Sequence, residues 1–359
     1  MKAMVLRAFG GPEQLVLETV TDPQPARDEI VLQVIRVSIN RSFDLVVRRG
    51  AYSRGAVLPL VLGADPSGIV TAVGQGVTSV KVGDRVAVMS TIPCGECREC
   101  RRGTSAQCGS SRTIGVHRWG GCAEYVAVPA SNVTLIPDQL DFGDATVIAR
   151  HGAAAYNFLV DRGRLREGET VVVFGASGAL GSFAVQVAKL MKTKVIAIVG
   201  ADRRAAFARE LGADAAINYC SGELVDQVMA LTENRGAELV LESSGDPQLW
   251  PLALQCVAHA GRLVSCGAHA GGTVAIDLKR VYTGRLQIIG AAGVNLSDLD
   301  WALAAGAHGD LKATIDRIYP LELVTAAHHY VERERPLGKV LIAAQPNFQS
   351  ALTGQRGYR

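Results

Sequence analysis

Four cysteines lie close together in the chain, and their chemistry is that of a metal site. Their spacing is Cys94-x2-Cys97-x2-Cys100-x7-Cys108. Four thiolates this close can bind one tetrahedral ion, for which Zn²⁺ is the natural choice, and they leave no open coordination position. The sequence therefore predicts one structural zinc in a lobe at about residues 93–110. Two disulfides or free thiols are the alternatives, and a cytosolic chain disfavours disulfides.

A second set of residues with chemical meaning is the segment Val-Val-Val-Phe-Gly-Ala-Ser-Gly-Ala-Leu-Gly at 171–181. An apolar run that ends in spaced glycines predicts a buried strand and a phosphate-binding turn, and a helix whose N-terminal amides face the anion. Gly175 allows the tight turn, Gly178 removes a side chain beside the pyrophosphate, and Gly181 lets the helix pack closely. Ordinary turns also use glycines, but a strand, a helix and a second strand at 194–199 follow in the required order. The predicted dinucleotide contacts are Gly175, Ala176, Ser177, Gly178, Ala179, Leu180 and Gly181.

The residues after the second strand bear on which nicotinamide cofactor binds. An NAD site usually has an acidic residue here for the ribose hydroxyls, whereas this chain has Gly200 followed by Ala-Asp-Arg-Arg. Arg203 and Arg204 can bind a 2′-phosphate in bidentate fashion, so we predict NADP(H). Asp202 keeps NAD(H) as an alternative, and a solvated helix turn is the alternative for the arginines. The predicted contacts outside the glycine-rich turn are Gly200, Arg203, Arg204, Tyr219 and Gly267.

The elements that must position these residues follow two patterns. Short β-branched runs between turn residues in 1–90 predict a β-barrel-like domain, whose strands resume after the cysteine lobe. From about residue 152, strands and helices alternate, which predicts an α/β fold with a doubly wound parallel sheet. The expected parts are a catalytic domain at 1–151, a dinucleotide-binding domain at 152–292, a return to the first domain at 293–345, and a poorly ordered polar tail at 346–359.

Composition excludes several classes of partner. The chain has 359 residues, of which 48% are hydrophobic and 20% charged, enough for about two domains with sizeable cores. Its formal charge of +3 is spread without a basic run, so we expect neither nucleic acid nor a membrane as partner. The N-terminus lacks the apolar core of a signal peptide, and we expect a cytoplasmic protein. Cys122, Cys220, Cys256 and Cys266 are predicted to be small core residues.

Taken together, these features resemble the medium-chain dehydrogenase/reductase superfamily. The resemblance implies a GroES-like β-barrel domain with a zinc lobe, a Rossmann domain, and NAD(P)-dependent oxidoreductase activity on a small-molecule substrate. We also expect a homodimer or homotetramer. Besides the cysteines and the glycine-rich turn, the resemblance is carried by Leu-Gly-Ala-Asp-Pro-Ser-Gly at 62–68, Val-Gly-Asp-Arg-Val at 82–86, Gly-Gly-Cys-Ala-Glu-Tyr-Val at 120–126, Leu-Gly-Ala-Asp at 211–214 and Gly-Lys-Val at 338–340.

The chain departs from this family where zinc-dependent members hold a catalytic zinc. Their ligand positions correspond here to Arg41, Ala64 and Arg150, none of which is a normal zinc ligand. The hydroxyl of the family's proton relay falls on Phe43. The active site therefore resembles zinc-free quinone oxidoreductase-like and enoyl reductase-like members.

Loss of the catalytic zinc changes which hydride acceptor is favoured. Hydride at a carbonyl carbon leaves an alkoxide, which zinc stabilises, whereas hydride at the β-carbon of an enone leaves an enolate, which hydrogen-bond donors can hold. We expect NADPH-dependent reduction of an enone, enoyl or quinone acceptor, with Tyr52 as first donor and Asn40 as second. Carbonyl reduction without metal and a non-catalytic NADPH-binding sensor or structural protein are the alternatives. For Tyr52 the alternative is a ring packed at the barrel edge.

The resemblance also places Arg41, Arg150 and His151 around the space that the catalytic zinc would fill. Unpaired buried charge is costly, so these groups predict a pocket for an anionic group of the substrate or for the developing enolate oxygen. His151 is a candidate proton donor. The alternatives are that Arg41 faces solvent and that Arg150 forms a structural bridge to Asp44 or Asp65.

Overall fold

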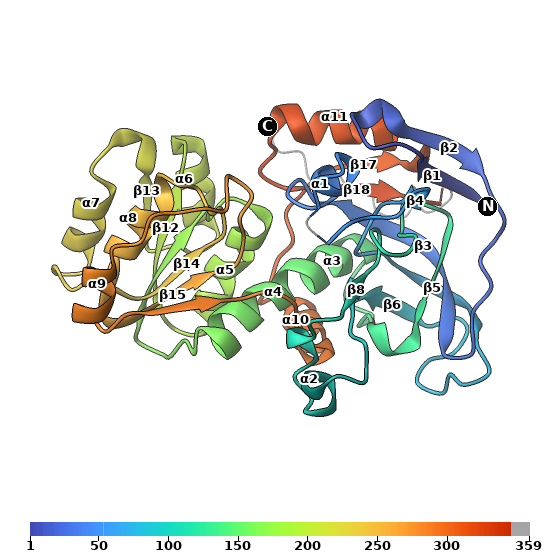
Figure 1. The fold of residues 1–359 in the computed structure, drawn as a ribbon, viewed down its shortest axis with the longest axis horizontal. Helices are drawn as coiled ribbons and strands as arrows, with labels where there is room; N and C mark the ends of the chain where they lie inside the picture. The colour runs from blue at the N-terminus through green and yellow to red at the C-terminus, as the bar shows by residue number, and fades with distance from the viewer. Residues whose placement is uncertain (53, 346–359) are drawn as a thin grey trace. The chain divides into compact units, whose positions relative to one another are not determined.

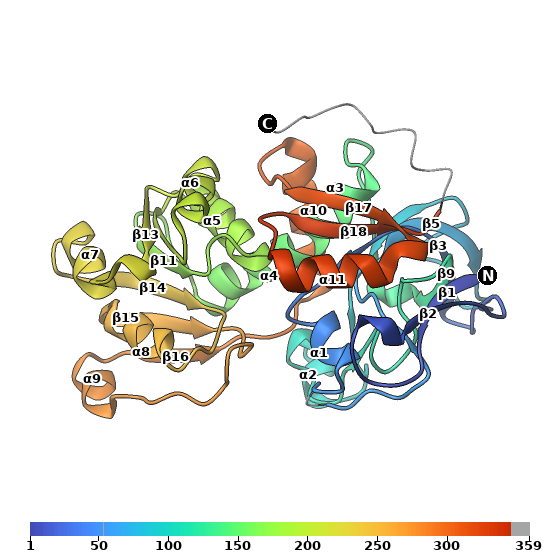
Figure 2. The same cartoon turned by 90° about the horizontal axis from the view of Figure 1, so that it is seen from above.

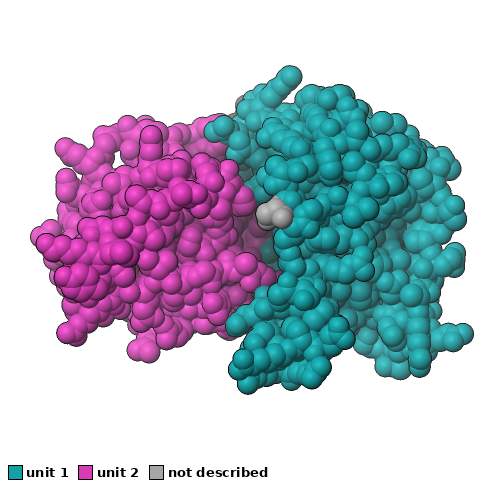
Figure 3. Space-filling model, viewed as in Figure 1, with its two compact units in different colours: residues 1–150, 313–359 teal, residues 151–312 magenta. Residues whose placement is uncertain are grey.

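The computed structural model describes residues 1–52 and 54–345. The chain divides into two compact units, one of residues 1–150 and 313–359 and one of residues 151–312 (Figure 3). The predicted tail at 346–359 lies outside the described residues. No helix in the described ranges is long and apolar enough to cross a membrane.

The boundary at the end of the second unit differs from the prediction. The sequence pattern ends this unit at residue 292, whereas the structure extends it to Lys312. Helix α10 (Leu296–His308) explains the difference, because it packs on the second unit. The Tyr156 and Trp301 rings stack with centroids 4.0 Å apart, and Asn157 Nδ2 donates a 2.9 Å hydrogen bond to Asp298 Oδ2.

The first unit is built around one long strand, β3 (Glu29–Ile39). It lies in a sheet of order β10-β6-β5-β3-β18-β17, and β9 also pairs with β3. The pairing of β18 with β3 is antiparallel, with Val340 opposite Ile39, so the C-terminal part of the chain returns to the end of β3 (Figure 1). The other strands of this sheet are β5 (Ser67–Val73), β6 (Arg85–Val88), β9 (Tyr125–Pro129), β10 (Val133–Leu135), β17 (Ile315–Pro320) and β18 (Lys339–Ala343).

Smaller elements complete the first unit. A second sheet has the order β2-β1-β4, and β7 pairs with β8 at the base of the cysteine lobe. These strands are β1 (Lys2–Leu6), β2 (Leu15–Thr19), β4 (Leu60–Val61), β7 (Thr91–Ile92) and β8 (Arg112–Thr113). The helical segments are η1 (Pro12–Gln14), α1 (Asp44–Arg48), α2 (Arg98–Arg101), η2 (Ser105–Gln107), η3 (Ala130–Asn132), α3 (Phe142–Val147), η7 (Leu321–Leu323) and α11 (Val324–Glu334).

The second unit contains the predicted parallel sheet. Its order is β13-β12-β11-β14-β15-β16, the order of a doubly wound dinucleotide-binding fold, with the switch point between β11 and β14. Val171, Val172 and Val173 have no exposed area, as expected for a strand covered on both faces. The strands are β11 (Thr170–Phe174), β12 (Lys194–Val199), β13 (Ala215–Asn218), β14 (Ala237–Glu242), β15 (Val257–Ser265) and β16 (Gln287–Gly290).

Helices cover both faces of this sheet, with α5 and α6 on one side and α8 on the other (Figure 2). Helix α8 stops at Gln255, and strand β15 already begins at Val257. The helical segments here are α4 (Ala153–Tyr156), η5 (Asn157–Arg162), α5 (Ala179–Leu190), α6 (Asp202–Glu210), η6 (Tyr219–Ser221), α7 (Leu224–Leu231), α8 (Leu249–Gln255) and α9 (Leu278–Thr283). A π-helical turn, η4 (Ile148–Gly152), spans the boundary between the units.

Candidate functional site

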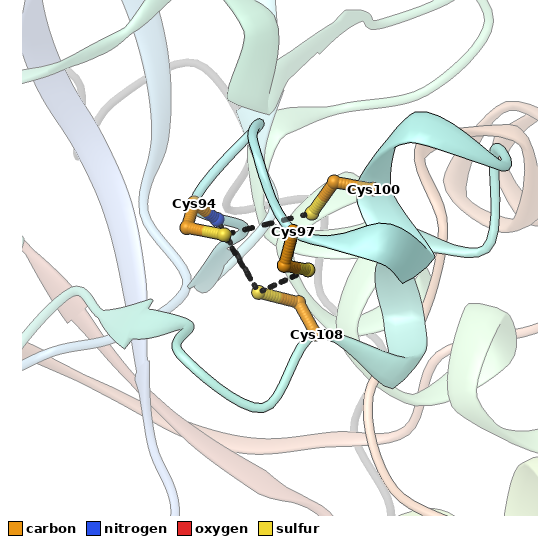
Figure 4. A group of neighbouring side chains, drawn as sticks. All are labelled: Cys94, Cys97, Cys100 and Cys108. Carbon is orange, nitrogen blue, oxygen red and sulfur yellow. Dashed lines mark hydrogen bonds between the residues drawn. The ribbon is translucent and has the colours of Figure 1, made fainter.

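The four cysteines of the lobe point their thiols toward one another (Figure 4). All four sulfur atoms lie within 4.8 Å of one another. The Sγ–Sγ distance from Cys94 is 3.5 Å to Cys108 and 4.0 Å to Cys100, and Cys97 lies 3.9 Å from Cys108. A tetrahedral shell with Zn–S bonds of about 2.3 Å places the sulfurs about 3.8 Å apart. The cluster therefore fits one structural zinc.

The electrostatics of the lobe also favour a bound cation. Backbone N–H groups of Glu96 and Cys97 lower the pKa of the Cys94 thiol to about 7. Burial raises the pKa of Cys100 to about 12. A dication at the centre would stabilise all four thiolates and so offset the raised pKa of Cys100.

The glycine-rich turn joins β11 to α5 with the geometry of a phosphate site. Gly175 has φ +66°, in the left-handed region that glycine tolerates. A Cβ on Gly181 would lie 2.2 Å from the carbonyl oxygen of Gly175, so α5 packs on the turn as closely as glycine permits. Gly178 is the N-cap of α5, and no side chain caps the helix. The first amides of α5 are thus available to an anion such as a pyrophosphate.

Candidate phosphate-binding side chains lie at this turn and at the end of the neighbouring strand β12. Arg204, in the first turn of α6, donates a 3.2 Å hydrogen bond from Nη1 to Ser177 Oγ on the glycine-rich turn. The hydroxyl of Tyr219 covers the end of β12, since a Cβ on Gly200 would lie 2.8 Å from it. Arg203 is exposed. The predicted phosphate-binding residues therefore gather at the carboxyl ends of β11, β12 and β13.

Two further predicted positions are resolved in this unit. Asp202 Oδ1 accepts a 2.9 Å hydrogen bond from Asn218 Nδ2. Gly267 lies against β14, where an added Cβ would be 2.1 Å from the carbonyl oxygen of Ser243. Gly267 is thus a position of close backbone approach, where a side chain would collide with the Ser243 backbone.

A buried polar cluster lies at the end of β3 in the first unit. Asp65 accepts a 3.1 Å hydrogen bond from the Ser38 backbone, a 2.6 Å bond from Ser38 Oγ and a 3.1 Å bond from Asn40 Nδ2. Lys339 Nζ donates to Asn40 Oδ1 at 2.7 Å and to the Ile39 carbonyl at 2.9 Å. Asn40 is only 4% exposed, and its amide joins the Asp65 carboxylate to the Lys339 ammonium. Asn40, which is predicted as the second hydrogen-bond donor to the substrate, therefore also has a structural role in this network.

Asp44 completes the charge pattern of this cluster. Its Oδ2 accepts a 2.6 Å hydrogen bond from the Asn40 backbone, and its buried Oδ1 has no hydrogen-bond partner among the described residues. Burial and the Asp65 charge raise the pKa of Asp44 to about 6. Burial lowers the pKa of Lys339 to about 8, against the pull of both carboxylates.

The three residues at the predicted positions of the catalytic zinc ligands differ in their surroundings. Ala64 is fully buried, whereas Arg41 is exposed. Arg150 lies on the π-helical turn η4, donates a hydrogen bond to Ser90 Oγ, and holds its guanidinium carbon 5.5 Å from the Phe43 ring centroid. No ion pair joins Arg150 to Asp44 or Asp65 within the described ranges. The structural bridge that was the alternative for Arg150 is therefore absent as a direct contact among the described residues.

The other two candidate catalytic residues, Tyr52 and His151, pack against aromatic rings. Tyr52 is half-buried, and its ring lies edge-on to Phe43 and His117, with centroids 5.5 Å and 6.4 Å away. His151 is half-buried in the second unit and stacks on Phe183 at 6.4 Å.

Sequence reasoning missed Lys339 as a site residue and placed one cysteine wrongly. Lys339 opens the fully buried strand Lys-Val-Leu-Ile-Ala, and a lysine before such an apolar run is the signal that could have found it. Cys122 and Cys256 are buried as predicted and Cys266 is half-buried, but Cys220 is exposed. Cys220 falls in a short 3₁₀ segment at the sheet edge, where there is no core to fill.

Comparisons with known proteins agree with this architecture. A family model for the alcohol dehydrogenase GroES-like domain matches residues 26–138, and one for zinc-binding dehydrogenases matches residues 179–307. These ranges contain the cysteine lobe and the start of α5, respectively.

Similar proteins match almost the whole chain. Quinone oxidoreductase from Homo sapiens is 28% identical over 338 residues, which is 92% of this chain and 94% of that protein. Acryloyl-coenzyme A reductase from Metallosphaera sedula is 29% identical over 350 residues, 95% of this chain and 99% of that protein. A solved NAD-dependent alcohol dehydrogenase is 32% identical, with a TM-score of 0.90 over 96% of this chain and 100% of its own. The predicted fold class and enzyme class are confirmed, and the chain belongs to the medium-chain dehydrogenase/reductase superfamily as an NAD(P)-dependent oxidoreductase.

Proposed function

We propose that the protein is an NADPH-dependent reductase that works without a catalytic zinc and delivers hydride to a conjugated acceptor, such as an enone, an enoyl compound or a quinone. The observation that carries this proposal is the chemistry of the catalytic metal positions. Arg41, Ala64 and Arg150 replace the ligands, and the neighbouring Asp65 is already bonded to Ser38 and Asn40. In the described part of the chain, the four lobe cysteines are the only group arranged to hold a metal.

Reduction of a conjugated acceptor needs a hydride and a donor for the enolate oxygen. Bound NADPH supplies the hydride. Asn40 already uses its carbonyl oxygen on Lys339 and one amide hydrogen on Asp65, which leaves Tyr52 as the first choice of donor. A positioned proton donor contributes roughly 10²- to 10⁴-fold to such a step. The relatives that reduce a quinone or an acryloyl thioester by name support this acceptor class.

NADPH is proposed over NADH because of Arg204. Its guanidinium is hydrogen-bonded to Ser177 on the glycine-rich turn. The phenol of Tyr219 lies beside Gly200, at the end of β12. A 2′-phosphate bound there would meet a cation and two hydroxyl groups. Asp202, the residue that would favour NADH, is turned to Asn218.

The substrate is proposed to carry an anionic group. Arg150 presents a half-buried guanidinium, and its contacts among the described residues, with Ser90 and the Phe43 ring, are to uncharged groups. We further propose that Arg41 and His151 contribute to the same recognition. We also expect a homodimer or homotetramer, which sedimentation equilibrium tests.

The test is turnover of NADPH with matched acceptors. Purified protein is assayed with an enone, a quinone, an enoyl thioester and an aldehyde, and each rate is compared with that of Tyr52→Phe. We expect the first three to exceed the aldehyde, and Tyr52→Phe to lower kcat without changing the NADPH dissociation constant. Aldehyde as the best acceptor would favour carbonyl reduction, for which the similarity to a solved alcohol dehydrogenase is the support. Tight NADPH binding without turnover of any acceptor would favour the non-catalytic alternative.

A further inference from the structure

The side chain of Arg54 joins the segment that carries Tyr52 to the cysteine lobe. Its Nη1 donates a 3.0 Å hydrogen bond to Ser111 Oγ, and its Nη2 donates to the carbonyl oxygens of Ser111 at 2.7 Å and Gly109 at 3.1 Å. Gly109 follows directly after the zinc-binding Cys108. We call these three hydrogen bonds the Arg54 contact. A guanidinium bound through two nitrogens to three acceptors has a fixed plane, unlike a solvated arginine.

A second set of contacts connects the C-terminal end of the lobe to Tyr52. Strand β8 leaves the lobe, and the Thr113 backbone donates a 2.9 Å hydrogen bond to His117 Nδ1. Since Nδ1 accepts, a neutral His117 ring carries its hydrogen on Nε2, which lies 3.4 Å from the Arg54 carbonyl oxygen. The same ring lies edge-on to Tyr52.

The base of the lobe also touches the candidate anion site. Ser90, the hydrogen-bond partner of Arg150, directly precedes β7, the strand that leads into the lobe. Its carbonyl oxygen accepts a 3.0 Å hydrogen bond from the backbone of Ile114, directly after β8. Both strands of the lobe therefore end beside residues that are candidates for chemistry.

Tyr52 needs such support because no helix or strand holds it. Arg54 also lies outside any helix or strand, and Gly55 N donates a 3.0 Å hydrogen bond to the Tyr52 carbonyl oxygen. A proton donor must be held near hydrogen-bonding distance, and a displacement of about 1 Å can cost roughly a hundredfold in rate. The Arg54 contact joins Arg54 to a lobe that a bound zinc would make rigid.

We propose that the zinc lobe positions Tyr52 for proton donation. Arg54 is the positioning residue, because its side chain connects the lobe to the chain beside Tyr52. The inference rests on the proposed function, in which Tyr52 is the donor. Arg54 acts through Tyr52 and does not itself touch the substrate. The closed cysteine site thus contributes to turnover as well as to stability.

The experiment compares three variants of the full chain. Arg54→Met removes the contact, Arg54→Lys keeps a cation without the planar fork, and Arg102→Met is the matched control, an exposed arginine of the same lobe. Zinc content, hydrogen exchange of peptides that contain Tyr52, and kcat and KM for NADPH and acceptor are measured. For Arg54→Met we expect full zinc content, faster exchange at Tyr52, an unchanged KM for NADPH, and a kcat lowered roughly ten- to a hundredfold. Arg54→Lys should recover part of kcat, and Arg102→Met should match the wild type.

A double-mutant cycle separates this inference from the proposed function. If Arg54 acts through Tyr52, adding Arg54→Met to Tyr52→Phe lowers kcat little further. An equal loss in both backgrounds would overturn the inference, as would unchanged exchange at Tyr52 in Arg54→Met. A wrong donor assignment gives a different result: Tyr52→Phe keeps the wild-type kcat while exchange at Tyr52 still rises in Arg54→Met.

Discussion

Lys339 Nζ lies 2.7 Å from Asn40 Oδ1, so the first residue of β18 is bonded to the residue that follows β3. This contact places an ammonium group beside the buried carboxylates of Asp44 and Asp65, whose charges act on Lys339. The charges of Lys339 and Arg150 both favour the ionised form of Asp44. Lys339 and Arg150 therefore partly offset the charge of the buried Asp44 carboxylate.

The first prediction concerns the pH dependence of stability. The pKa of Asp44 is raised from 3.8 to about 6 in the folded protein. Between these values the folded state holds a proton that the unfolded chain has released, so stability falls as pH rises through this window. Asp44→Asn cannot lose that proton. As pH rises from about 4 to 6, the free energy of unfolding of Asp44→Asn should therefore increase relative to that of the wild type, by up to about 3 kcal/mol.

Urea unfolding at several pH values measures this difference. Asp138→Asn is the control, because the Asp138 side chain is fully exposed. Parallel curves for Asp44→Asn and the wild type would contradict the prediction.

The elements were more predictable from the sequence than the contacts between distant segments. The apolar run of β11 and the glycines after it indicate a buried strand and its turn from local chemistry alone. Lys339 and Asn40 meet only because β18 pairs antiparallel with β3, and no local pattern carries that register. The extent of the second unit was missed for the same reason, since α10 is held there by stacking of Trp301 on Tyr156. The Arg54 contact likewise depends on where the lobe folds back.

The second prediction is the cofactor preference. Arg204→Glu places a carboxylate beside Ser177, where the 2′-phosphate is proposed to bind, and like charges repel. The ratio of the NADPH and NADH dissociation constants should shift roughly ten- to a hundredfold toward NADH, the scale of one or two charge-assisted hydrogen bonds. Fluorescence titration measures both constants. Arg203→Glu, at an exposed position on the same helix, should shift the ratio less. An unchanged ratio in Arg204→Glu would mean that the arginine is only a surface residue.

The third prediction is one zinc per chain. The lobe cysteines are the only described group with metal-binding geometry, so elemental analysis of purified protein should give one equivalent. Cys108→Ser should lower it, and chelation should destabilise the fold because metal binding and folding are coupled. In zinc-depleted protein that remains folded, exchange at Tyr52 should also rise. Two equivalents, with the second lost on substitution of Asp65, would contradict the absence of a catalytic metal.

The last prediction is recognition of an anionic acceptor by Arg150. Its guanidinium is half-buried, bonded to neutral Ser90 and placed over the Phe43 ring, and no described acidic residue is in direct contact with it. An unsaturated keto acid and its methyl ester have nearly the same shape and differ in charge. Arg150→Gln should raise KM for the acid roughly tenfold or more, the scale of a charge-assisted hydrogen bond, and leave the ester nearly unchanged. Arg41→Gln should act in the same direction but less, since Arg41 is exposed. If acid and ester weaken equally in both variants, the arginines serve as scaffold, and the charge of Arg150 acts on Asp44 alone.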